Sequence, residues 1–209
     1  GTPPRGRLRL RNGESQDFRL EEDPSKQLLE VVGKKNPNAA QLAAVELWFP
    51  NDYARDGVVI IDTPGVNDRE EWRERVTIEA LGHSDAVLFL LDAQKPLTAS
   101  EMSFLRANVL TAWGRQILFV INKADTLRPE ERKAVRMRCV ELLSEVVAEP
   151  RVLFVASLSA FKAIVAGDDK ALADSELPAV GAVLYRQLVE ERLALYVQDR
   201  SARLRALAD

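Results

Sequence analysis

Two short polar segments follow runs of apolar residues, and the first has residue types that suit phosphate chemistry. It is Asp62-Thr63-Pro64-Gly65, directly after the four β-branched residues 58–61. An apolar run without alternation predicts a strand buried on both faces of a parallel α/β sheet, and such sheets bind ligands at the carboxyl ends of their strands. We therefore expect Asp62 to hold Mg²⁺ through a water molecule. We expect Gly65 to act as a catalytic residue, because a peptide N–H without a neighbouring Cβ can approach a terminal phosphate closely.

The second segment is Asn122-Lys123-Ala124-Asp125, which follows the apolar run 117–121. The Asp125 carboxylate can accept two hydrogen bonds, one from the ring N–H of guanine and one from its exocyclic amino group. Adenine lacks this donor pair, and an unpaired carboxylate is costly, so the site selects guanine. Asn122 is expected to tie the loop to its neighbours, and the Lys123 stem to lie across the base. Together the two segments predict a GTPase-type domain that binds GTP or GDP with Mg²⁺.

The chain resembles the G domain of the dynamin superfamily, most closely that of the bacterial dynamin-like proteins. The stretch Gln94 to Glu101 is similar to the Q-P-L-T-x-S-E stretch of those proteins and is more particular to them than the two polar motifs are. The resemblance implies a P-loop NTPase-type α/β fold, a mostly parallel sheet flanked by helices. It also implies hydrolysis of GTP to GDP and phosphate, coupled to membrane remodelling. The matching segments are residues 57–68, 85–92, 94–101 and 122–125.

The resemblance implies two further site residues. G domains carry a Ser-Ala pair that supports the guanine; here the order is Ala156-Ser157, with Ser159-Ala160 two residues later, so Ser157 is the candidate. Thr2 is the candidate for the switch I threonine, which contacts Mg²⁺ and orients the attacking water.

The sequence does not contain the phosphate loop G-x-x-x-x-G-K-[ST] that a G domain needs. Its one Gly-Lys pair, Gly33-Lys34, is followed by Lys35 and has Leu28 five positions before Gly33. We therefore expect a G domain without its N-terminal phosphate-loop segment and central strand. By itself it is expected to bind GTP poorly, to be inactive, and to show a gap or a collapsed pairing in its sheet. The predicted domains are residues 1–174, the truncated G domain, and 175–209, a long C-terminal helix that begins a helical neck bundle.

Composition bounds the location and the partners. The 209 residues are 46% apolar and 29% charged, with a net charge of −3, which disfavours nucleic acid as a partner. The single Cys139 fits a reducing cytoplasm, and the chain contains no apolar run of about 18 residues that could span a membrane. We expect a cytoplasmic protein, peripheral to a membrane, that self-associates across its nucleotide face and through the helical bundle. Lipid contacts are expected from regions outside this chain.

Two alternatives to the dynamin-like function stay open. An Era-like GTPase associated with ribosomes or RNA shares both motifs, although the acidic balance and the amphipathic C-terminal stretch count against it. A nucleotide-free interaction fragment is the other, and the missing phosphate loop is its evidence. The expected strands are 5–11, 43–49, 58–61, 87–91, 117–121 and 152–155. The expected helices are 23–32, 69–81, one capped by Thr98 or Ser100, 129–147 and 177–207, with a short helix and loop at 163–174.

Overall fold

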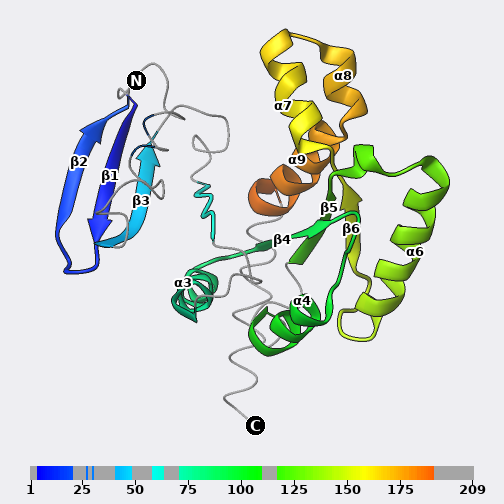
Figure 1. The fold of residues 1–209 in the computed structure, drawn as a ribbon, viewed down its shortest axis with the longest axis horizontal. Helices are drawn as coiled ribbons and strands as arrows, with labels where there is room; N and C mark the ends of the chain where they lie inside the picture. Colours follow the sequence, from blue (N-terminus) through cyan, green and yellow to red (C-terminus); the bar gives the residue numbers. More distant parts are fainter. Residues whose placement is uncertain are drawn as a thin grey trace. The chain divides into compact units, whose positions relative to one another are not determined.

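The computed structural model of the chain describes residues 4–20, 27, 30, 41–48, 58–63, 71–109 and 117–190. The chain divides into two compact units, with the boundary between Val59 and Ile60 (Figure 1). Thr2, Gly65 and most of the helix expected at 23–32 lie outside the described residues.

The first unit is a three-stranded antiparallel sheet in the order β2-β1-β3, formed by β1 (Arg5–Leu10), β2 (Ser15–Arg19) and β3 (Leu42–Trp48). It confirms the strands expected at 5–11 and 43–49. Arg7 pairs across the strands with Asp17 (Nε to Oδ1, 2.6 Å), and Arg9 pairs with Glu46 (Nε to Oε1, 2.8 Å). The alternating arginines therefore lie on a solvated strand face with their counter-charges beside them.

The second unit contains a parallel sheet in the order β4-β5-β6, formed by β4 (Val87–Asp92), β5 (Ile117–Asn122) and β6 (Arg151–Phe154). Helices flank this sheet (Figure 1), which confirms the α/β fold class and the helices expected at 69–81 and 129–147. The helical elements are α3 (Glu71–Gly82), α4 (Ala99–Phe104), the π-helical turn η2 (Leu105–Val109), the 3₁₀ turn η3 (Ala124–Thr126), α6 (Pro129–Ser144), α7 (Ser157–Ala166), α8 (Asp169–Asp174), α9 (Leu177–Tyr185) and the π-helical turn η4 (Arg186–Glu190).

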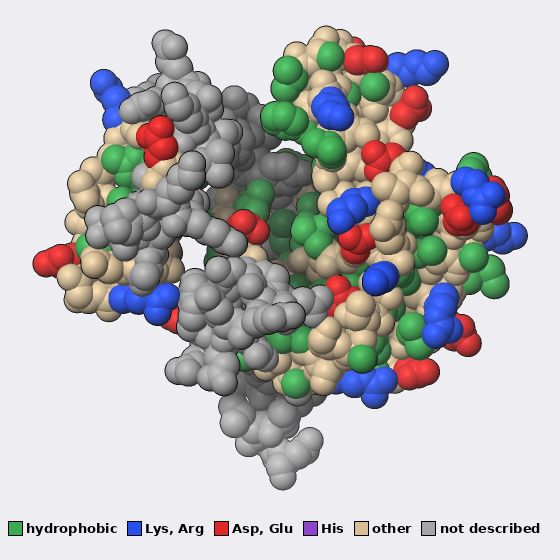
Figure 2. Space-filling model, viewed as in Figure 1, with side chains coloured by type: hydrophobic (Ala, Val, Ile, Leu, Met, Phe, Trp, Pro, Cys, Tyr) green, Lys and Arg blue, Asp and Glu red, His purple; other side chains and the backbone are tan. Residues whose placement is uncertain are grey.

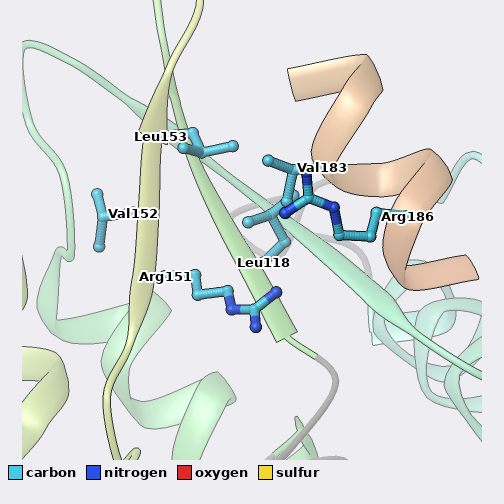
Figure 3. Close-up of a pocket in the computed structure, with 6 residues that line it drawn as sticks. All are labelled: Leu118, Arg151, Val152, Leu153, Val183 and Arg186. Carbon is cyan, nitrogen blue, oxygen red and sulfur yellow. The ribbon is translucent and has the colours of Figure 1, made fainter. Parts of the chain in front are cut away.

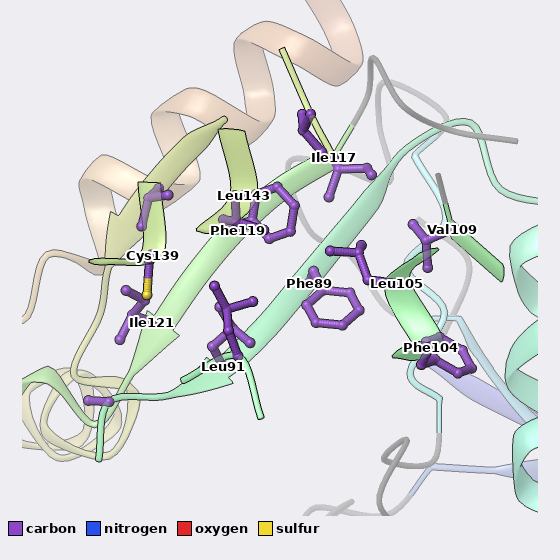
Figure 4. Close-up of a cluster of buried hydrophobic side chains, with 14 of the residues drawn as sticks. Phe89, Leu91, Phe104, Leu105, Val109, Ile117, Phe119, Ile121, Cys139 and Leu143 are labelled. Atoms are coloured by element: carbon purple, nitrogen blue, oxygen red, sulfur yellow. The ribbon is translucent and has the colours of Figure 1, made fainter. Parts of the chain in front are cut away.

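Strand β5 is buried on both faces, as its apolar run predicts. On one face Phe119 contacts Phe89 of β4, with 6.0 Å between ring centroids. The core on that face is completed by α4, η2 and α6 (Figure 4). On the other face Leu118 and Val120 pack with Val180 of α9. Side chains alternate across a strand, so one run of six residues supplies both cores.

Local signals explain where the helices begin. Thr98 caps α4: its Oγ1 accepts a hydrogen bond from the Glu101 N–H, and the Glu101 carboxylate accepts one from the Thr98 N–H at 2.7 Å. Pro129 begins α6, where a missing N–H has no cost. Cys139 of α6 is buried, which raises the pKa of its thiol to about 11.

The expectation of a buried strand at residues 58–61 is wrong. The structure assigns no strand there, and Val59, Ile60 and Ile61 are 82%, 78% and 50% exposed. Within the described part of the chain the sheet ends at β4, and no described strand pairs with residues 58–61. A β-branched run needs a hydrogen-bonding neighbour to become a strand, and composition does not supply one.

Strand β4 is also less buried than predicted. Leu91 and Phe89 face the core, but Leu88 and Leu90 on the opposite face are 40% and 57% exposed. The described helices therefore cover one face of β4.

The region after β6 is more helical than the helix and loop expected at 163–174. It forms α7 and α8, which Gly167 separates with a left-handed φ of 66°. Hydrophobic side chains gather on the surface over α7 (Figure 2), where Phe161 and Val165 are 65% and 73% exposed.

The long helix predicted at 177–207 is helical over residues 177–190, as α9 and η4, and the rest lies outside the described residues. The division at residue 174 stays a prediction. Within the described part of the chain, no helix is both long and apolar enough to cross a membrane.

Candidate guanine-binding site

The predicted guanine loop begins where β5 ends and turns sharply. Lys123 has left-handed backbone angles (φ 62°, ψ 34°), and the 3₁₀ turn η3 follows at once. Both the backbone N–H and the Oγ1 of Thr126 donate to the Lys123 carbonyl, at 3.0 and 2.7 Å. The turn thus carries Asp125 on a short, internally hydrogen-bonded segment.

Asn122 joins this loop to the start of α7. Its Oδ1 accepts hydrogen bonds from the Lys123 N–H at 2.7 Å and from the Ser157 N–H at 3.2 Å. The loop is tied to its neighbour as predicted. Ser157 takes part through its backbone, and its support of a guanine stays a prediction.

Asp125 is exposed, and a serine that the sequence analysis did not select orients its carboxylate. The Ser159 Oγ donates to Asp125 Oδ2 at 2.7 Å. Ser159 is the third residue of α7, and helical side chains point back towards the N-terminus of their helix, so its hydroxyl reaches the loop. The second Ser-Ala pair in the sequence was the signal for this residue.

Lys123 forms an ion pair with Asp92, the last residue of β4. Asp92 is a second residue that the sequence did not mark as a site candidate. Asp92 lies beside Asn122 in the parallel register, and its Oδ1 accepts a hydrogen bond from the Gln94 N–H at 2.9 Å. The hydrogen bond from Lys123, together with that from Gln94, lowers the pKa of the Asp92 carboxyl below its usual value. The Lys123 stem therefore runs from the end of β5 towards the end of β4.

Two further elements support the loop from behind. The Ala124 N–H donates to the Val155 carbonyl at 3.1 Å. Arg132 of α6 donates from Nε to the Ala124 carbonyl at 3.1 Å and pairs through Nη1 with Glu176 at 2.6 Å. The candidate guanine loop is thus held by β4, by Val155 directly after β6, and by α6 and α7.

The donor set fits a guanine. Asp125 offers an exposed carboxylate that is already oriented, and a guanine can supply the two donors that this carboxylate accepts. The residues Asn122, Lys123 and Asp125 would hold the base, and their roles stay predictions.

The phosphate side is less complete among the described residues. Asp62 is exposed and follows the unpaired run 58–61. In the described part of the chain no three acidic, histidine or cysteine side chains gather as a metal site. Mg²⁺ keeps several waters and often takes one or two carboxylates from the protein, so Asp62 fits as a single ligand. Its role, and those of Gly65 and Thr2, stay predictions.

Comparisons with known proteins show which family the chain resembles. The model of the dynamin family matches residues 4–124, more than half of the chain. The chain is 36% identical over 81 residues to the probable transmembrane GTPase FZO-like, chloroplastic, of Arabidopsis thaliana, covering 39% of this chain and 9% of that protein. It is 32% identical over 101 residues to dynamin-like protein 1 of Campylobacter jejuni, covering 48% of this chain and 14% of that protein.

A solved structure shares the fold. Described as an oligomerised bacterial dynamin pair that provides a mechanism for long-range sensing and tethering of membranes, it superposes with a TM-score of 0.67 at 18% identity. The alignment covers 98% of this chain and 41% of that one. This chain thus spans less than half the length of each of these relatives.

Proposed function

The chain belongs to the dynamin family, and we propose that it is the guanine-reading part of an enzyme that hydrolyses GTP to GDP and phosphate. The observation that carries the proposal is the Asp125 carboxylate, exposed at the end of an anchored loop and oriented by Ser159. A carboxylate fixed before binding loses less conformational freedom when the base arrives.

Selectivity for guanine follows from the cost of an unpaired group. Guanine satisfies the carboxylate with two donors, whereas adenine presents no such pair and leaves charged acceptors without partners. The Lys123 stem, drawn towards Asp92, supplies an apolar surface beside the base.

The chemistry at the phosphates is proposed from the residues on that side. When bound, Mg²⁺ supplies charge stabilisation at the terminal phosphates. Asp62 would hold the ion through a water molecule, the Gly65 N–H would stabilise the terminal phosphate, and Thr2 would orient the attacking water. The barrier is lowered by positioning and charge, without a covalent intermediate.

Membrane remodelling and self-association are the finer part of the proposal. The solved neighbour is described as an oligomerised pair that tethers membranes, and its fold matches nearly the whole of this chain. By this proposal the protein works in the cytoplasm at a membrane surface, self-associates, and contacts lipid through regions outside residues 1–209. The dynamin family match favours this function over the Era-like alternative.

The decisive experiment is Asp125→Asn in the full-length protein, with affinities measured for GTP, ATP and xanthosine triphosphate. The asparagine amide donates a hydrogen bond where the carboxylate accepted one, so the variant should no longer prefer GTP over ATP. Xanthosine triphosphate, whose base has a carbonyl in place of the amino group, should bind more tightly to the variant than to the wild type. Asp169→Asn, on exposed α8, is the matched control and should leave all three affinities unchanged. If discrimination between GTP and ATP survives Asp125→Asn, the guanine loop is wrongly assigned. If the wild-type protein binds no nucleotide, the interaction-fragment alternative replaces this function.

A further inference from the structure

A pocket of about 350 Å³ lies at the opposite ends of the strands from the guanine loop (Figure 3). Leu118 is the second residue of β5 and Arg151 the first of β6, whereas Asn122 ends β5. The pocket is therefore separate from the proposed nucleotide site. It is lined by Leu118, Arg151, Val152, Leu153, Val183 and Arg186.

The fold brings two arginines from different elements to this pocket. Arg151 is the register partner of Leu118, so both side chains lie on the same face of the sheet, the face that α9 covers. Val183 and Arg186 are three residues apart, which places them on one side of α9 and η4. Figure 3 shows both guanidinium groups on the side where Leu118 and Val183 lie.

Neither guanidinium has a counter-charge within the part of the chain that the structure describes. Among the described residues no carboxylate pairs with Arg151 or Arg186, although Arg7, Arg128 and Arg132 all have partners within 4 Å. Two like charges in one pocket repel each other, and an anion between them removes that repulsion. The planar guanidinium fork also matches the geometry of phosphate and carboxylate groups.

The rest of the pocket is apolar. Leu118 is fully buried beneath it, and Leu153 and Val183 are partly buried. A pocket with a few polar groups over an apolar floor binds ligands that have both characters. We propose that this pocket binds an amphipathic anion, with its phosphate or carboxylate head between Arg151 and Arg186 and its apolar part on Leu118, Leu153 and Val183.

The test is a titration of the protein with n-octyl phosphate below its micelle concentration, followed by methyl NMR and calorimetry. The methyl signals of Leu118, Leu153 and Val183 should shift. Inorganic phosphate and 1-octanol, which each have only half of the chemistry, should each bind at least about tenfold more weakly. Equal affinity for inorganic phosphate and octyl phosphate would overturn the apolar half of the proposal.

The double variant Arg151→Gln with Arg186→Gln should weaken octyl phosphate binding at least about tenfold. The control removes the same charge from exposed positions of α6, on the other face of the sheet, with Lys133→Gln and Arg138→Gln. Equal losses in the two double variants would show a general charge effect and overturn the site. The methyl shifts of the wild-type protein test the site even if a variant folds poorly, and unshifted methyls contradict it.

Two further measurements complete the test. One distinguishes between two sources of such a ligand, and the other distinguishes this pocket from the proposed nucleotide site. Dihexanoyl phosphatidic acid represents a lipid headgroup, and octanoate represents a free acyl carboxylate; tighter binding of one identifies the source. GDP should not displace octyl phosphate, because the guanine loop lies at the other ends of the strands. Displacement by GDP would mean that the probe occupies the nucleotide site, and the proposal would fail.

Discussion

Strand β5 and residues 58–61 are alike in apolar character but differ in structure. Both are short apolar runs that end at a polar motif, and both predict a buried strand. In β5 the residue Phe119 is fully buried, whereas Ile60 is 78% exposed. The difference lies in the neighbours: β5 has hydrogen-bonded strands on both sides and helices on both faces, and residues 58–61 have no described strand beside them. An apolar run therefore shows where a strand can form, and its partners decide whether it does.

The same contrast extends to the loops that follow. The Asn122 loop is anchored by hydrogen bonds to β4, to Val155 directly after β6, and to α6 and α7, but Asp62 follows an exposed segment without a described strand beside it. The candidate guanine loop is thus held in place in the described structure, and of the residues predicted for the phosphate side the structure describes Asp62.

The largest expected effect is on stability, and it comes from comparing a substitution in β5 with one in residues 58–61. Phe119→Ala should destabilise residues 1–209 by about 3–5 kcal/mol, because it leaves a cavity beside Phe89 in a closed core. Ile60→Ala should change the free energy of unfolding by less than about 0.5 kcal/mol, as at other exposed positions. Urea unfolding measures both values. A loss at Ile60 comparable to that at Phe119 would show that residues 58–61 are buried after all.

A smaller effect is expected at the two serines of α7. Ser159→Ala in the full-length protein should weaken GDP binding about fivefold, because the exposed Asp125 carboxylate loses one oriented hydrogen bond. Ser157→Ala should leave the affinity unchanged, since Ser157 contributes its backbone N–H and alanine keeps that group. Fluorescence titration with a labelled GDP gives both constants. If Ser157→Ala instead weakened GDP binding more than Ser159→Ala, the Ser157 side chain would be the one that supports the guanine.

The Lys123–Asp92 pair predicts a pH dependence of stability. The pKa of Asp92 is lowered in the folded protein, so the pair stabilises it above the unfolded pKa of about 3.9 and loses this contribution as the pH falls through the lower folded pKa. Asp92→Asn should therefore be less stable than wild type at neutral pH and equal to it in acid. Urea unfolding at neutral pH and in acid, below the lowered pKa of Asp92, compares them. Glu145→Gln, which breaks the exposed pair with Arg106, controls for a general surface charge effect. A stability gap for Asp92→Asn that persists in acid contradicts the assignment.

The smallest expected effect is the difference in affinity between GTP and guanosine. Residues 1–209 contain no phosphate loop, so the chain should read mainly the base and bind the two ligands weakly, within about threefold of each other. It should not hydrolyse GTP measurably. Calorimetry with GTP and Mg²⁺, and then with guanosine, tests this. Low-micromolar affinity for GTP would mean that other residues hold its phosphates.

Much of this protein can be predicted from its sequence because the signals are local. The apolar run of β5, the capping pair of Thr98 and Glu101 and the motif from Asn122 to Asp125 each depend on residues close together in the chain. Such patterns are determined by backbone geometry and by the chemistry of a few side chains. The sequence by itself therefore determined the fold class and the place of the candidate guanine loop at the end of β5.

Contacts between distant residues were decided by the tertiary structure. Ser159 meets Asp125 across 34 positions, because α7 begins at Ser157 and its third side chain points back to the loop. Lys123 meets Asp92 across 31 positions, because the parallel register sets β4 beside β5. Helix phase and strand register depend on how whole elements pack, and no local pattern contains that information. The exposure of residues 58–61 has the same origin, since burial is a property of neighbours rather than of the residue itself.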